Sequence, residues 1–82
     1  MIDDIALHVR NKVAEARGLA LEEVMLDRTF LDLGIDSLTA VSIAGDLEDD
    51  FGVSMPNADV LRLRTVRDVV EAVERLVREN AA

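Results

Sequence analysis

The chain has 82 residues, no cysteine and a formal net charge of −8, from 17 acidic and 9 basic side chains. This length predicts a single domain over residues 1–82, without disulfides or thiolate metal ligands. The acidic balance excludes nucleic acid as a partner and favours a partner with a basic surface, unless it serves only solubility. No apolar run approaches the ~20 residues of a membrane span, and no secretory signal is present. We therefore expect a cytoplasmic protein without membrane contact.

A first helix, roughly residues 3–16, is predicted from apolar side chains at helical spacing. These residues are Ile2, Ile5, Ala6, Val9, Val13 and Ala16. Asp3 and Asp4 in the first turn, and Arg17 followed by Gly18 at the end, suit the helix dipole and a C-cap. His8, the only histidine, falls off the apolar stripe, so we expect it to be solvated.

The next segment, residues 18–36, shows no period but is rich in apolar side chains. A loop of this length is uncommon in a compact domain, and its apolar content argues against disorder. We expect it to pack across the molecule with Phe30 as its anchor, and "LEEV" to form one helical turn.

Three further helices follow in the pattern. The second is predicted over residues 37–51, with a narrow core stripe at Ala40, Ile43, Ala44, Leu47 and Phe51. Gly52 and Pro56 end it, and Asn57 can cap a short third helix. Thr65 and Asp68 form a capping box for the last helix, whose core stripe is Val66, Val69, Val70, Val73, Leu76 and Val77. The predicted fold class is all-α, a small four-helix bundle with three longer helices, one short helix and a long loop between the first two.

Two aliphatic residues of the second helix fall off its core stripe. Leu38 and Val41 lie there with Gly45 beside them. Single exposed apolar residues are ordinary, and the long loop could also cover these two. Alternatively, they form a contact patch that docks a basic, partly apolar partner and is ringed by Asp46, Glu48 and Asp49. Glycine inside a helix costs ~1 kcal/mol relative to alanine, which indicates that bulk is unwelcome at this position.

Ser37 stands at the N-terminus of the second helix. Amide N–H groups and the positive end of the helix dipole favour a phosphate there, so an esterified serine is one interpretation. The other is that Asp36 or Ser37 is only an N-cap.

Catalysis is poorly supported, because no histidine is near Ser37 in the sequence and "GIDSL" does not fit the G-x-S-x-G elbow. The acidic residues 46–50 lack the EF-hand pattern, so we predict no catalytic residue and no metal site.

The stretch "LGIDSL", residues 33–38, resembles the 4′-phosphopantetheine attachment motif of acyl carrier proteins. The likeness continues in the upstream "F-x-x-LG", in "LEDDFGVSMP" and in "TVRDVVEAV". It implies that Ser37, flanked by Asp36 and Leu38, bears a covalent 4′-phosphopantetheine derived from coenzyme A. A protein of this kind holds acyl intermediates as thioesters and is not itself an enzyme.

The resemblance also implies partners: a phosphopantetheinyl transferase, a ketosynthase, an acyltransferase and other synthase enzymes. They would contact the second helix at Val41, Glu48 and Asp49, with Asp46 in the same acidic ring. "DSLTAV" is similar to polyketide synthase carriers and "FGVSMP" to freestanding ones, so we expect a discrete, monomeric polyketide-type carrier. A fatty-acid carrier is the alternative, although Thr39 and Ser42 replace its usual carboxylates. An unmodified acidic helical adaptor is the alternative of another class.

Overall fold

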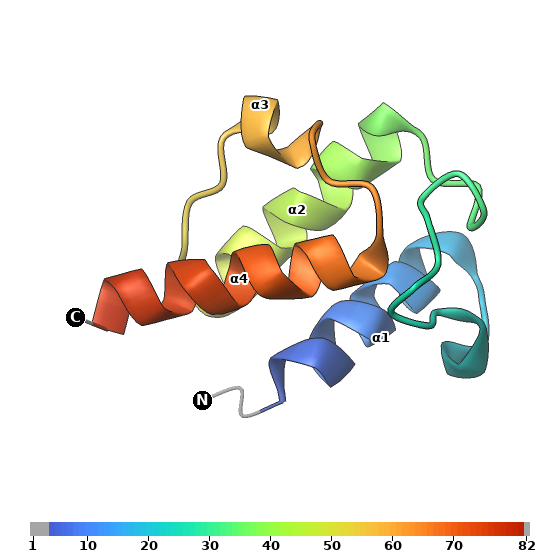
Figure 1. Ribbon diagram of the computed structural model, residues 1–82, viewed down its shortest axis with the longest axis horizontal. Coiled ribbons are helices and arrows are strands. Elements are labelled where there is room, and N and C mark those ends of the chain that lie inside the picture. The colour runs from blue at the N-terminus through green and yellow to red at the C-terminus, as the bar shows by residue number, and fades with distance from the viewer. Residues whose placement is uncertain (1–3, 82) are drawn as a thin grey trace.

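The computed structural model describes residues 4–81, and these contain α1 (Ile5–Arg17), α2 (Ser37–Phe51), α3 (Asn57–Val60) and α4 (Val66–Ala81). A single 3-10 turn, η1 (Leu21–Glu23), lies between α1 and α2, within the predicted "LEEV". α4 runs beside α1 and crosses α2, while α3 packs on α2 at the side away from α1 (Figure 1). The predicted all-α bundle of three longer helices and one short helix is confirmed. Within the described part of the chain, no helix is both long and apolar enough to cross a bilayer.

The core is aliphatic and forms one cluster. Its most deeply buried side chains are Val9, Val13, Val24, Leu47, Val66 and Val73. The stripe predicted for α2 is confirmed at Ala40, Ile43, Ala44 and Leu47, with Phe51 half-buried at its end. The prediction that Ala16 belongs to the core is wrong, because Ala16 is exposed. The buried face of α1 consists of Val9, Val13 and Ala14. Ile2 lies outside the described residues.

The free amide groups at the helix starts are satisfied by a side chain in α1 and by a backbone carbonyl in α3. Asp4 is the N-cap of α1 and accepts a hydrogen bond from the Leu7 amide at 2.9 Å, so it precedes the first turn instead of lying in it. The predicted cap at Asn57 is wrong. Pro56 holds the N-cap position of α3 without a side-chain bond, and its carbonyl accepts from the Asp59 amide at 2.9 Å.

The capping box of α4 is confirmed. The Asp68 amide donates to Thr65 Oγ1 at 3.1 Å, and the Thr65 amide donates to Asp68 Oδ2 at 3.1 Å. Asp68 Oδ2 also accepts from the Arg64 amide at 2.9 Å. These bonds lower the pKa of Asp68, the Arg64 amide first, so its carboxylate stays charged at the positive end of α4.

The long loop packs across the start of α4, as its apolar content predicts. Phe30 is half-buried against the core, and its amide donates to the Arg64 carbonyl at 2.9 Å. The Val66 amide donates to the Arg28 carbonyl at 3.1 Å, which completes an isolated antiparallel bridge at Thr29 and Thr65. These contacts fix the path of the chain into α2.

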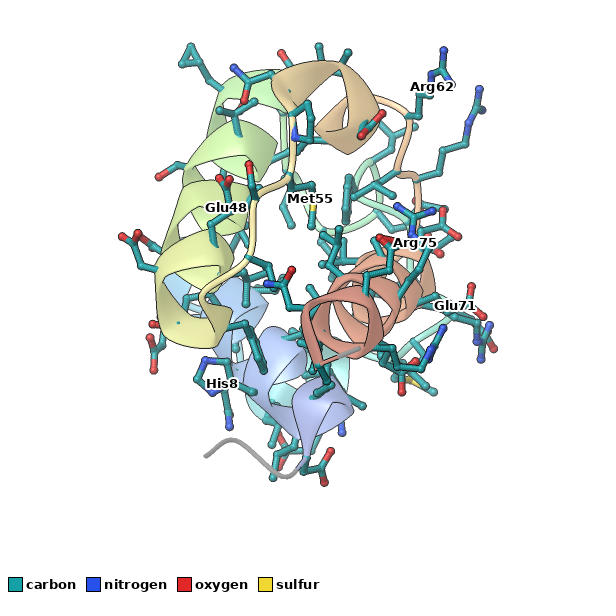
Figure 2. The ribbon with its side chains drawn as sticks, turned by 90° about the vertical axis from the view of Figure 1, so that its left-hand side faces the viewer. His8, Glu48, Met55, Arg62, Glu71 and Arg75 are labelled. Carbon is teal, nitrogen blue, oxygen red and sulfur yellow. The ribbon has the colours of Figure 1, made fainter. Side chains whose placement is uncertain are left out.

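His8 is not the solvated residue that its place off the stripe predicts. Its Nε2 atom lies 2.7 Å from Asp50 Oδ2, which Lys12 Nζ approaches to 2.9 Å. The ring also meets Phe51 edge to face, with centroids 5.1 Å apart. The bonds from His8 and then Lys12 lower the pKa of Asp50. His8 therefore joins α1 to the C-terminal end of α2 (Figure 2).

Candidate functional site

Ser37 is the first residue of α2 and is exposed. The preceding residue, Asp36, performs the capping: its Oδ1 accepts from the Thr39 amide at 2.8 Å, and its carbonyl accepts from the Ala40 amide at 2.9 Å. The question of which residue caps α2 is thereby answered. The Ser37 hydroxyl is left free of that role and faces solvent.

The Asp36 carboxylate is held in its charged form. Its pKa is lowered below the ordinary 3.8, first by the bond from the Thr39 amide, then by the Thr39 side chain, with a smaller contribution from the charge of Arg17. A negative charge therefore stands beside the serine at neutral pH. Because Asp36 engages the Thr39 amide, the amide groups of Ser37 and Leu38 have no hydrogen-bond partner within residues 4–81. Such free groups at a helix start can receive a phosphate oxygen.

The turn before Ser37 is anchored from the inside. Leu33 and Ile35 are buried, at 5% and 7% exposure, while Gly34 between them has a left-handed φ of 70°. The Ile35 amide donates to the Phe30 carbonyl at 2.8 Å. Two buried side chains on either side of a glycine direct the following Asp36 and Ser37 outward.

A depression of about 190 Å³, with both polar and apolar lining, borders Ser37. Its lining comprises Phe30, Ile35, Asp36, Ser37, Ala40, Val60, Leu61 and Leu63. Several of these residues also line an interior cavity of about 10 Å³, enough for a single water molecule at most. The helices are therefore closely packed below the depression, and a chain attached at Ser37 would lie at the surface unless they separate.

Leu61 is a residue that the sequence reasoning missed. It follows α3, is 58% exposed and faces the same depression as Ser37. A helix of 4 residues is too short for a periodic pattern to show which of its neighbours lies outside. The one available signal was an apolar residue at the end of a short helix.

The predicted partner face on α2 is only partly exposed. Leu38 is 77% exposed, and Asp46 and Asp49 are exposed as well. The prediction that Val41 lies near solvent is only half right, because Val41 is half-buried and packs against the core. Glu48 has an internal partner: its Oε2 accepts from the Met55 amide at 2.8 Å, beside the segment that joins α2 to α3 (Figure 2).

Gly45 does not owe its lack of a side chain to packing inside the molecule. A Cβ atom built on Gly45 would meet no heavy atom within 4 Å, apart from its own helix backbone. Gly45 instead contributes to a shallow hollow on the outer surface of α2, together with Asp46, Glu48, Asp49, Gly52, Val53 and Ser54. Any exclusion of bulk at this position must come from outside the chain.

Ser37 has no catalytic surroundings in the part of the chain that the structure describes. His8, the only histidine of the sequence, is bound to Asp50 at the opposite end of α2. Among residues 4–81, no group of three or more histidine and acidic side chains is placed to hold a metal ion. The arrangement offers an exposed hydroxyl group at a helix start, and the neighbouring Asp36 carboxylate is engaged by the Thr39 amide.

Comparison with known proteins establishes the class of this protein. The family model described as "Phosphopantetheine attachment site" matches residues 8–73. The chain belongs to this family, the phosphopantetheine-binding acyl carrier proteins, whose members carry acyl groups and are not enzymes. It is therefore a carrier with a covalently attached 4′-phosphopantetheine.

Relatives and solved structures cover nearly the whole chain. The acyl carrier protein of Rhodococcus erythropolis is 40% identical over 80 residues, which are 96% of this chain and 88% of the relative. The meromycolate extension acyl carrier protein of Mycobacterium tuberculosis is 38% identical, covering 95% and 69%. The 3,5-dioxohexyl acyl carrier protein of the actinorhodin polyketide synthase from Streptomyces coelicolor superposes with a TM-score of 0.81 at 28% identity, covering 96% and 95%.

Proposed function

We propose that Ser37 is the attachment residue and that its Oγ atom carries the 4′-phosphopantetheine as a phosphodiester. The observation that carries this proposal is the exposed hydroxyl of Ser37 at the first position of α2, freed from capping by Asp36. The residues present fit the group: two unpartnered amide donors lie at the helix start for a phosphate oxygen, and the depression with polar and apolar lining lies alongside. Asp36 and Leu38 flank the attachment point.

The arm supplies the thiol on which acyl groups are held as thioesters, and the chain itself contains no cysteine. In the loading reaction that we propose, the serine hydroxyl of Ser37 loses its proton, and its oxygen forms a bond to the phosphorus of coenzyme A that bears the pantetheine arm. The bond between that phosphorus and adenosine 3′,5′-bisphosphate breaks. A phosphopantetheinyl transferase with Mg²⁺ catalyses this step and takes up the proton of the serine hydroxyl.

The synthase partners in our proposal are a ketosynthase and an acyltransferase. Their docking face is α2 around Leu38 and Val41, with Asp46, Glu48 and Asp49 attracting a basic surface. Leu61 extends this face across the depression to the end of α3. We further propose that the chain is a single carrier domain that works as a cytoplasmic monomer.

For the pathway we propose polyketide synthesis, supported by the structural likeness to the actinorhodin carrier and by the "DSLTAV" sequence. A fatty-acid-type carrier is the second candidate. It is favoured by the identity to the Rhodococcus carrier and to the meromycolate extension carriers, which exceeds the identity to the actinorhodin structures.

Intact mass spectrometry tests the attachment. The protein is incubated with coenzyme A, Mg²⁺ and a promiscuous transferase, and wild type should gain about 340 Da, the mass of an esterified phosphopantetheine group. Ser37→Ala should gain nothing. Ser42→Ala, which removes another exposed serine of α2, is the matched control and should gain the same mass as wild type. An unmodified wild type, or a modified Ser37→Ala, contradicts the proposal and returns the unmodified adaptor to consideration.

A further inference from the structure

The turn before Ser37 is also held from the outside, by the last residue of α1. Arg17 Nε donates to the Leu33 carbonyl at 3.3 Å. The same guanidinium group lies against Gly34: a Cβ built on Gly34 would stand 3.0 Å from Arg17 Nη2 and 3.6 Å from its Cζ. Arg17 therefore packs on the backbone of the turn where the glycine leaves room for it.

The charge of Arg17 acts on the same short segment. The Asp36 pKa is lowered mainly by hydrogen bonds from Thr39, and Arg17 adds a smaller attraction. One side chain thus bonds Leu33, covers Gly34 and attracts Asp36, all within the four residues before Ser37. Neither the motif nor the helical period points to Arg17, which in the sequence is only a basic residue at a helix end.

We propose that Arg17 is a positioning residue for Ser37. Its guanidinium group holds the Leu33–Gly34 turn against the end of α1 and so sets where the serine hydroxyl stands for modification. This inference rests on the proposed function of Ser37 as the attachment residue.

The expected effect is on the rate of modification and not on folding. Phosphoryl transfer to Ser37 requires its Oγ to stand in line with the phosphorus, and a small misplacement lowers the rate strongly. Leu33 and Ile35 keep the turn anchored in the core when Arg17 is removed, since both are buried. The turn then loses its outer support while the bundle remains.

The test compares two arginines of α1 that hold the same loop. Arg17→Met should lower kcat for modification about tenfold, with the KM for coenzyme A unchanged, because only the alignment of the acceptor is altered. Arg17→Lys, which keeps a cation and a donor, should be intermediate. Arg10→Met is the control: Arg10 donates to the carbonyls of Val24 at 2.7 Å and Leu21 at 3.1 Å, far along the loop from Ser37. It should be modified at the wild-type kcat.

A second variant tests the contact itself. In Gly34→Ala the new Cβ would stand 3.0 Å from Arg17 Nη2, so the guanidinium group has to shift by a few tenths of an ångström, and alanine also strains the left-handed backbone at φ 70°. This variant should therefore also be modified slowly. The double variant Arg17→Met/Gly34→Ala should be slowed less than the product of the two single effects. If the effects multiply, Arg17 and Gly34 act independently and the proposal is wrong.

Two other outcomes also overturn the proposal: wild-type kcat in a folded Arg17→Met, or equal slowing of Arg17→Met and Arg10→Met. Circular dichroism verifies folding, and if Arg17→Met does not fold, an unaltered kcat in Arg17→Lys contradicts the proposal as well. Failure of the proposed function looks different, because the wild-type protein itself then gains no mass.

Discussion

At the scale of single residues, two neighbours at the start of α2 have different roles. Asp36 and Ser37 both belong to residue types that cap helices, and either could have performed that role. The structure assigns the cap to Asp36, which accepts the Thr39 amide at 2.8 Å. Ser37 moves to the first helical position, where its hydroxyl remains accessible. Because Asp36 accepts the hydrogen bond from the Thr39 amide, the Ser37 hydroxyl is not needed for that role.

The cap makes a prediction about pH. Because the folded protein lowers the Asp36 pKa below 3.8, the cap contributes stability above that value, and the contribution is lost as pH falls through the lowered pKa. Carboxyl-detected NMR should give a titration midpoint for Asp36 below 3.8, and the Thr39 amide shift should follow the same midpoint. Asp36→Asn should abolish that pH dependence of Thr39. A midpoint at or above 3.8 would mean that the cap does not form in solution.

At the scale of elements, α2 contains both the proposed attachment residue and the proposed docking face. Its buried stripe packs against α1 and α4, and its outer face leaves Leu38, Asp46 and Asp49 exposed. Gly45 stands in that outer face with open space around it. The interior of the protein therefore does not require a glycine at this position. A partner that approaches α2 closely could require one.

Gly45→Ala tests this possibility. Alanine is the better helix former by ~1 kcal/mol, so the variant should have a higher free energy of unfolding in urea, by up to about that amount. If a partner approaches closely at this position, ketosynthase turnover of the loaded carrier should fall at the same time. Ser42→Ala, another exposed position of α2, is the control and should leave turnover unchanged. Unchanged turnover of Gly45→Ala would show that no partner needs the space.

At the scale of the whole molecule, charge is distributed unevenly. In the view of Figure 2, Glu48 of α2 lies on one side, while the other side is mixed, with Arg62, Arg75 and Glu71. His8 and Lys12 bond to Asp50 at the end of α2, while Asp46 and Asp49 are exposed on the same helix. If α2 is the docking face that we propose, a basic partner surface is drawn to this helix.

Salt should weaken this attraction. Transfer rates to a synthase partner are expected to fall as ionic strength rises from low to physiological values, because the Debye length shortens to about 8 Å. Asp49→Asn should reduce the slope of that dependence. Glu15→Gln removes the same charge from an exposed position on α1 and should leave the slope unaltered. Equal slopes for the two variants would mean that net charge, and not the face of α2, guides the encounter.

Much of the fold could be predicted because its signals are local. Helical spacing of apolar residues placed α2 at residues 37–51, and turn chemistry placed the Thr65–Asp68 capping box. The prediction that Asn57 is an N-cap failed because a residue type that often caps helices can also be the first residue of a helix. Only the backbone path after Pro56 decides which of the two positions Asn57 occupies. Attachment at Ser37 stays a prediction from the motif, whereas the choice of Asp36 as the cap beside it required coordinates.

By itself, the sequence determined the helical class, the bounds of α2, the aliphatic core and the likeness that marks Ser37, since each depends on neighbouring residues or on a short motif. The tertiary structure alone decided the contacts between distant segments: His8 with Asp50, Phe30 with the start of α4, Leu61 beside Ser37 and Arg17 on the turn before it. The physical reason is that such contacts follow from how helices pack against one another, and a helical period specifies which face is buried but not what it meets.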